Sequence, residues 1–191
     1  QQMLMEIVKS EFDYSPNLER NVMRAIKDGA DPYSIVDNKE SAFQLAAKNG
    51  KFEIIDQLIK SKTPNETELL QINNALIALE NHMKNSVHGH HELLLNNYIN
   101  LYKAYKNSKN HDVDESKKKD CLKKIEDLLN QPDVNPYDTY QRKDVSSKTP
   151  ISHYQLANDI PEIKSLIEKK FPDRLSTKKL EEKRAREAME N

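Results

Sequence analysis

"SAFQLAAKNGKFEIIDQLI", residues 41–59, contains two short apolar-periodic segments that are separated by a glycine. Apolar residues that recur every three or four positions predict helices over 41–48 and 52–62. Gly50 lies between these helices, where the chain must reverse, and glycine adopts the left-handed conformation of such turns at little cost. The stretch therefore predicts a helical hairpin.

A similar stretch, "TPISHYQLANDIPEIKSLI", begins 108 residues later at Thr149. In this gapless alignment Asn158 takes the place of Gly50, and asparagine is a residue that tolerates the left-handed conformation. The turn Asp31-Pro32-Tyr33 also recurs, as Asn135-Pro136-Tyr137. Recurrence of this kind indicates a repeat protein.

The rest of the chain also has helical periodicity, and no convincing alternating strand pattern occurs. Thr63-Pro64-Asn65-Glu66 and Thr149-Pro150 have the composition of helix N-termini. Gly29 lies where a left-handed residue would end a helix. The sequence thus predicts an all-α fold, with further helices over 66–84, 90–107 and 116–130.

These patterns resemble ankyrin repeats, in which Leu-Ala-Ala lies on a short inner helix before a glycine turn. Leu45-Ala46-Ala47 and Gly29-Ala30-Asp31-Pro32 match that family pattern, and Thr149-Pro150-Ile151 opens a later unit. The resemblance implies an α-solenoid of about four irregular helix pairs, because one pair alone cannot bury both of its faces. Ala46 and Ala47 would be small where neighbouring inner helices approach closely.

The resemblance also divides the chain. We expect a repeat domain over 1–174 and a charged capping helix or tail over 175–191. Because stacked pairs need an even number of helices, we interpret 66–84 and 116–130 as a pair and 90–107 as an inserted helix. The units are then about 1–36, 37–65, 66–148 with an insertion near 88–115, and 149–174.

The charge balance gives no general attraction to polyanions, because 30 basic and 31 acidic residues give a net charge of −1. We therefore expect neither a membrane nor a nucleic acid as the partner. No apolar run approaches the roughly 18 residues of a membrane span. The single cysteine, Cys121, excludes an internal disulfide and fits a reducing, cytoplasmic compartment. We expect it to be buried, since it shares an apolar helix face with Leu122 and Ile125.

The sequence offers only weak candidates for a metal site or a catalytic site. His82, His88, His90 and His91 could suggest zinc, but their spacing does not bring them to one helix face, and a polar turn is the better interpretation. With three glycines in the chain, a glycine-rich phosphate loop is not expected, and no catalytic motif occurs. We expect no enzyme activity, metal, cofactor or small-molecule substrate. A basic cluster is diluted by acidic neighbours and is read as a solvated helix face: Lys117, Lys118, Lys119, Lys123 and Lys124.

The resemblance implies that the finger loops and the concave face of the stack bind a partner protein. The finger residues that we predict to bind it are Tyr33, Lys39, Tyr137, Tyr140, Arg142 and Lys143. We also predict that Tyr98 and Tyr102 bind the partner, as an added ridge on the 90–107 helix, because tyrosine is favoured in interfaces. The alternatives are ordinary exposed loops for the finger residues and core packing for Tyr98 and Tyr102.

The sequence therefore predicts a protein–protein interaction module. Its irregular units and Lys/Asn-rich composition resemble ankyrin effectors that intracellular bacteria secrete into host cells, which implies a host protein as the partner. The alternative is the recognition domain of a larger effector enzyme whose catalytic domain lies outside these residues. A zinc-dependent or nucleic-acid-binding protein is the third interpretation.

Overall fold

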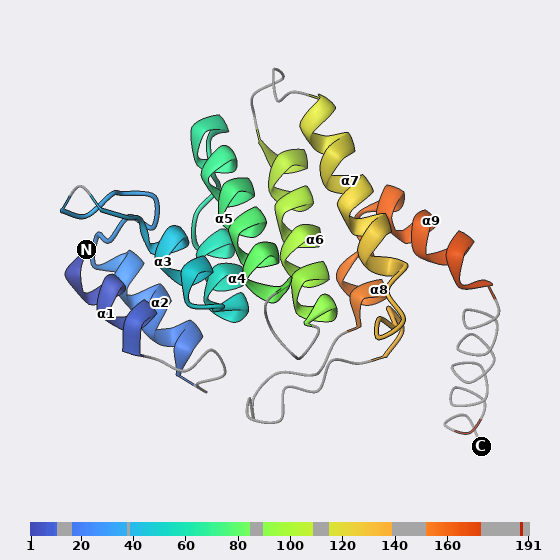
Figure 1. Ribbon diagram of the computed structural model, residues 1–191, viewed down its shortest axis with the longest axis horizontal. Coiled ribbons are helices and arrows are strands. Elements are labelled where there is room, and N and C mark those ends of the chain that lie inside the picture. The colour runs from blue at the N-terminus through green and yellow to red at the C-terminus, as the bar shows by residue number, and fades with distance from the viewer. Residues whose placement is uncertain are drawn as a thin grey trace.

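The computed structural model describes residues 1–10, 17–37, 39–84, 90–108, 115–138, 152–172 and 188. The regular structure of these residues is helical and contains no strand, and Val36 and Glu40 form an isolated bridge. The helices (Figure 1) are α1 (Gln2–Ser10), α2 (Leu18–Lys27), α3 (Ala42–Lys48), α4 (Phe52–Ser61), α5 (Glu66–Lys84), α6 (His91–Asn107), α7 (Glu115–Leu129), α8 (His153–Leu156) and α9 (Pro161–Lys170).

The predicted helices from α3 to α7 occur within one residue of their expected bounds. Their starts are fixed by side chains that satisfy the first free backbone N–H groups. At α3, Ser41 Oγ accepts from the Gln44 N–H at 3.3 Å, and Gln44 Oε1 accepts from the Ser41 N–H at 2.8 Å. At α5 the same exchange joins Asn65 and Glu68, so the cap is two residues after Thr63, where the sequence pattern Thr63-Pro64 suggested a start.

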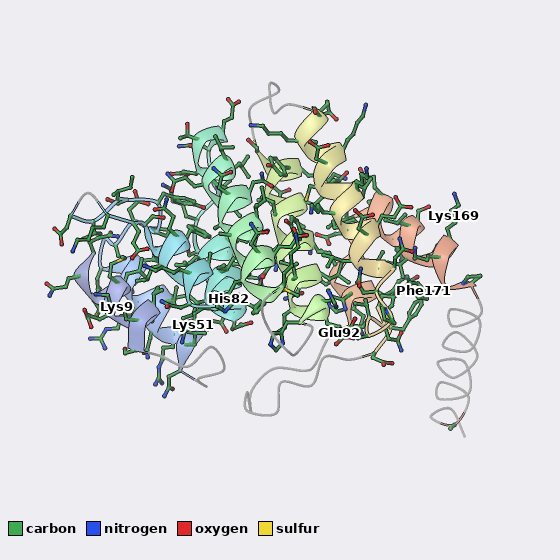
Figure 2. All side chains as sticks on the ribbon, viewed as in Figure 1. Lys9, Lys51, His82, Glu92, Lys169 and Phe171 are labelled. Carbon is green, nitrogen blue, oxygen red and sulfur yellow. The ribbon has the colours of Figure 1, made fainter. Side chains whose placement is uncertain are left out.

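Two glycines end helices as predicted. Gly29 has φ of 95° and Gly50 has φ of 65°, a region that residues with a Cβ rarely adopt. After α3, the Gly50 N–H donates to Ala47 O and the Lys51 N–H to Ala46 O, which is a Schellman motif. A Cβ on Gly50 would also approach His82 Nε2 to 2.9 Å. Figure 2 shows His82 next to Lys51, so this turn lies against the end of α5.

The second copy of the hairpin is in a different register from the expected one. Ser152 and Gln155 form the capping box at α8, so Ser152 is the counterpart of Ser41, three residues later than Thr149. Ala157 then corresponds to Ala46, and both are fully buried. Asn158 is therefore no counterpart of Gly50 and does not have a positive φ. Thr149-Pro150 lies outside the described residues.

The first six helices pack in two rows. α1 contacts α3, and α3 contacts α5; α2 contacts α4, and α4 contacts α6. The members of the two rows also contact each other as α1 with α2, α3 with α4 and α5 with α6. Ala42, Ala46 and Ala47 of α3 are fully buried, and these small side chains allow α3 to approach three neighbouring helices.

α6 differs most from its expected role. The prediction treated 90–107 as an insertion and paired 66–84 with 116–130, but α6 packs against α4, α5, α7 and α8. In Figure 1 it lies between α5 and α7 at the centre of the molecule. The physical reason is that its buried apolar residues lie on more than one side of the helix, so α6 must pack against several neighbours. The fully buried members include Leu95, Ile99 and Leu101.

A buried polar cluster joins α4 to α6. Asp56 of α4 accepts hydrogen bonds from the side-chain amides of Asn96, Asn97 at 2.6 Å and Asn100 at 3.1 Å. Burial raises the pKa of Asp56, and Lys60 and the three amides oppose that rise. Because an unpaired buried carboxylate would be costly, these bonds fix how α6 is rotated against α4.

Replacement of Ala46 by leucine tests the close packing of α3. Ala46 is fully buried and leaves no exposed space for the larger side chain, so we expect a loss of about 1–3 kcal/mol in the free energy of unfolding. Urea unfolding followed by circular dichroism measures it, with Lys48→Leu on the exposed side of the same helix as the control. Equal stability of both variants would contradict the packing of α3.

Candidate functional site

The two finger turns have the same local structure. Asp31 Oδ1 accepts from the Tyr33 N–H at 3.1 Å, and Asn135 Oδ1 accepts from the Tyr137 N–H at 3.3 Å. A proline lies between the two residues in each turn and restricts φ. The sequence repeat of these turns is therefore also a structural repeat.

The tyrosines of these turns, which we predicted to contact a partner, are buried in the structure. Tyr33 is 5% exposed, and its ring stacks on Phe43 of α3 with centroids 4.9 Å apart. Tyr137 is 9% exposed, and its ring lies 5.0 Å from that of Tyr154 in α8. Burial is the main cause of a raised pKa at both phenols. A nearby carboxylate raises the pKa further, that of Glu68 for Tyr33 and that of Glu168 for Tyr137. Both tyrosines attach a turn to the following helix.

Tyr98 and Tyr102 of α6 are also buried, which agrees with the alternative of core packing. Tyr98 is 1% exposed, and its hydroxyl donates to Glu80 Oε2 at 3.5 Å. Cys121 Sγ lies 3.5 Å from the Tyr98 carbonyl oxygen, and burial raises the pKa of its thiol. Cys121 is thus a core residue, as predicted.

Among the predicted partner-binding residues that the structure describes, Lys39 has an exposed side chain. Tyr140, Arg142 and Lys143 lie outside the described residues, as does the charged segment over 175–187. The predicted binding set is therefore not brought together as one surface by the residues described.

The structure instead exposes large apolar side chains that the sequence interpretation did not select. Among the described residues these are Met3, Met23, Ile35, Leu70 and Ile77. Leu70 and Ile77 both belong to α5, seven residues apart, with 42% and 43% of their surfaces exposed. Ile35 follows the first finger turn and is 58% exposed.

One side of α5 carries no charge over about four turns. Its exposed residues between the two ends of the helix, here called the α5 face, are Thr67, Leu70, Asn74, Ile77, Ala78 and Asn81. The opposite side of α5 is buried through residues such as Leu69, Ile72 and Leu76. The sequence does contain a signal for this exposed face. α5 has apolar residues on both of its sides, and a helix that packs against a core on one side needs them on that side alone.

The histidines that could have suggested a zinc site do not form one among the described residues. The structure described contains no group of three or more metal-ligating side chains that could hold an ion. His91 Nδ1 lies 2.8 Å from Asp133 Oδ1, and the His90 ring packs against Phe52 at 5.4 Å. His88 lies outside the described residues.

A shallow hollow of about 210 Å³ between α4 and α6 is lined by Lys60, Lys62 and Lys103. Lys62 is paired with Glu68 at 2.7 Å, and Lys103 with Asp159 at 2.9 Å. Neighbouring carboxylates therefore compensate much of the positive charge of this hollow, and it is a weaker candidate site than the α5 face.

His153 of α8 is a buried imidazole at the start of α6. Its Nε2 lies 2.9 Å from the Glu92 carbonyl oxygen, which only accepts, so Nε2 carries the proton. Glu92 lies at the lower end of α6 in Figure 2. Burial lowers the pKa of His153, and its hydrogen bond to Glu92 opposes this. The neutral imidazole thus joins α8 to α6.

In comparisons with known proteins, no family model, curated protein or solved structure matches the chain. None of the helices that the structure describes has the length and apolar character needed to cross a membrane.

Replacement of Tyr33 by alanine tests its structural role. The loss of the stacked ring leaves a cavity, so we expect the free energy of unfolding to fall by about 3 kcal/mol. Tyr33→Phe keeps the ring and removes a buried hydroxyl without a hydrogen-bond partner among the described residues, so little change is expected. Urea unfolding of both variants measures this, and an unchanged Tyr33→Ala protein would mean that the turn is not held by the ring.

His153 makes stability depend on pH. Because its folded-state pKa lies below the ordinary value near 6.5, the unfolded chain takes up a proton first as the pH falls. The contribution of the neutral His153 to the free energy of unfolding is therefore complete above about pH 6.5 and is lost as the pH falls below this value. Unfolding measured between about pH 7.5 and 5 should show a weaker pH dependence for His153→Gln than for the parent protein. Identical slopes would contradict the burial of a neutral imidazole.

Proposed function

We propose that this protein binds another protein and that the α5 face is the centre of the contact surface. The observation that carries the proposal is the exposure of Leu70 and Ile77 on a face without charge, in a chain of which 32% is charged. The cores of protein interfaces are depleted of charged residues, and exposed apolar groups on a rigid element are typical of them.

The packing of α5 against its neighbouring helices favours binding at the α5 face. α5 packs against α3 and α6 through its buried side, so the helix that carries the exposed side chains is already held in place. A surface that is ordered before binding loses less conformational entropy when the partner arrives. The face therefore needs no rearrangement to act as a docking surface.

The order of the helices supports an ankyrin-like interpretation of this surface. α5 follows α1 and α3 in one row, and α3 carries the Leu45-Ala46-Ala47 motif on which the resemblance rests. In an ankyrin-like stack this row would be the inner one, whose helices contact partners. The resemblance to effectors delivered by intracellular bacteria makes a host-cell protein the partner to search for.

A double substitution of Leu70 and Ile77 by serine tests the proposal. Both side chains are exposed, so the fold should be retained, whereas the partner should lose its main apolar contact. Affinity capture from host lysate with quantitative mass spectrometry compares the variant with the parent protein. The matched control is Met23→Ser on α2, where the methionine is 45% exposed.

We expect specific partners to be captured by the parent protein and by Met23→Ser and to be reduced at least tenfold with the double variant. Equal capture by all three proteins would place the contact surface elsewhere. A loss with Met23→Ser alone would assign it to the α1–α2 end of the molecule.

A further inference from the structure

The α5 face has the spacing of a coiled-coil seam. Five of its six members, here called the seam, recur at intervals of three and four residues along the helix: Thr67, Leu70, Asn74, Ile77 and Asn81. An alternation of three and four is the pattern with which one α-helix packs along another. Over about 14 residue steps of 1.5 Å the seam is about 21 Å long, enough for several turns of a second helix.

The chemistry of the seam restricts what can cover it. Leu70 and Ile77 occupy one heptad position, and Asn74 occupies the other between them. An asparagine amide that becomes buried needs a hydrogen-bond partner, whereas the aliphatic side chains need apolar contact. A matching helix therefore has aliphatic residues opposite Leu70 and Ile77 and an uncharged polar residue opposite Asn74.

The sides of the seam offer no unpaired charge. Glu80, seven residues after Asn73, is partly exposed and is paired with Lys124 Nζ at 2.9 Å. Gln71 and Asn73, both partly exposed, and Ala78, which is exposed, border it. A strongly acidic or basic segment would gain no ion pair from these neighbours and would lose hydration. The covering helix is thus expected to be uncharged along its contact stripe.

The two ends of α5 carry opposite charges. Glu66 is exposed in the first turn, and Lys84 is exposed in the last. Helices favour acidic residues in their first turn and basic residues in their last, which complements the helix dipole. A helix that runs antiparallel to α5 therefore places its acidic start near Lys84 and its basic end near Glu66.

From this spacing and charge pattern we infer that the occupant of the α5 face is an amphipathic α-helix of another protein, antiparallel to α5. The inference rests on the proposed function and adds the class of partner segment and its direction. The alternation of aliphatic and polar residues on the α5 face selects a partner helix with the matching alternation. The charges at the two ends of α5 select the direction of that partner helix.

The test uses a synthetic peptide of about 20 residues, which form about five helical turns. Its contact stripe alternates leucine with asparagine, its first turn carries glutamates and its last turn carries lysines. The control peptide has the same stripe with the end charges exchanged. Fluorescence anisotropy with the full chain measures both affinities, and analytical ultracentrifugation measures the oligomeric state.

We expect the first peptide to bind the parent protein and Met23→Glu equally and to bind Ile77→Glu at least tenfold more weakly. The exchanged peptide should bind about threefold to tenfold more weakly than the first, because its end charges are repulsive in the antiparallel direction and oppose its own helix dipole in either direction. These results together support both the helix and its direction.

Equal binding of the two peptides would overturn the antiparallel arrangement. Binding of neither peptide would overturn the helical occupant, and the proposed function would stand if the serine double variant still lost its captured partners. Self-association that Ile77→Glu abolishes would assign the face to a second copy of this chain and would also overturn the inference.

Discussion

The burial of α6 is the constraint on which the rest of the structure depends. A helix with Leu95 and Ile99 buried on one side and Leu101 on the opposite side cannot lie at the surface, so other helices must pack on both sides of it. Apolar burial alone would allow several rotations of such a helix, because hydrophobic contacts have no direction. Asp56 removes this freedom, since three amides of α6 reach it in one rotation.

The position of α6 also determines what α5 can do. α5 uses its buried side for contacts with α3 and α6, and its other side remains exposed. Leu70 and Ile77 lie outside the buried core, and covering their exposed surface by another molecule would be favoured by the hydrophobic effect. The same packing that stabilises the fold therefore leaves a rigid apolar surface.

Local features could be predicted from the sequence because they depend on neighbouring residues. Helix bounds, the glycine turns at Gly29 and Gly50 and the burial of Cys121 follow from periodicity and backbone preference. Helix pairing could not be predicted, because several amphipathic helices can pack together in more than one order. The register of the second hairpin was predictable in principle, since Ser152 and Gln155 repeat the capping box of Ser41 and Gln44.

The candidate site was harder to predict, because exposure depends on tertiary contacts. Tyr33 lies in a polar turn but folds back onto Phe43, and no local pattern distinguishes that from an exposed tyrosine. Leu70 and Ile77 look like core residues in the sequence and are exposed because α5 packs through its other side.

The most direct test of the central role of α6 is native-state hydrogen exchange of the full chain, read residue by residue by NMR. Amides in the middle of α6 should exchange most slowly, together with those of α4 around Asp56, because they open only when the whole domain unfolds. Exchange in α6 as fast as in α1 or α9, at the two ends of the helix array, would contradict the account.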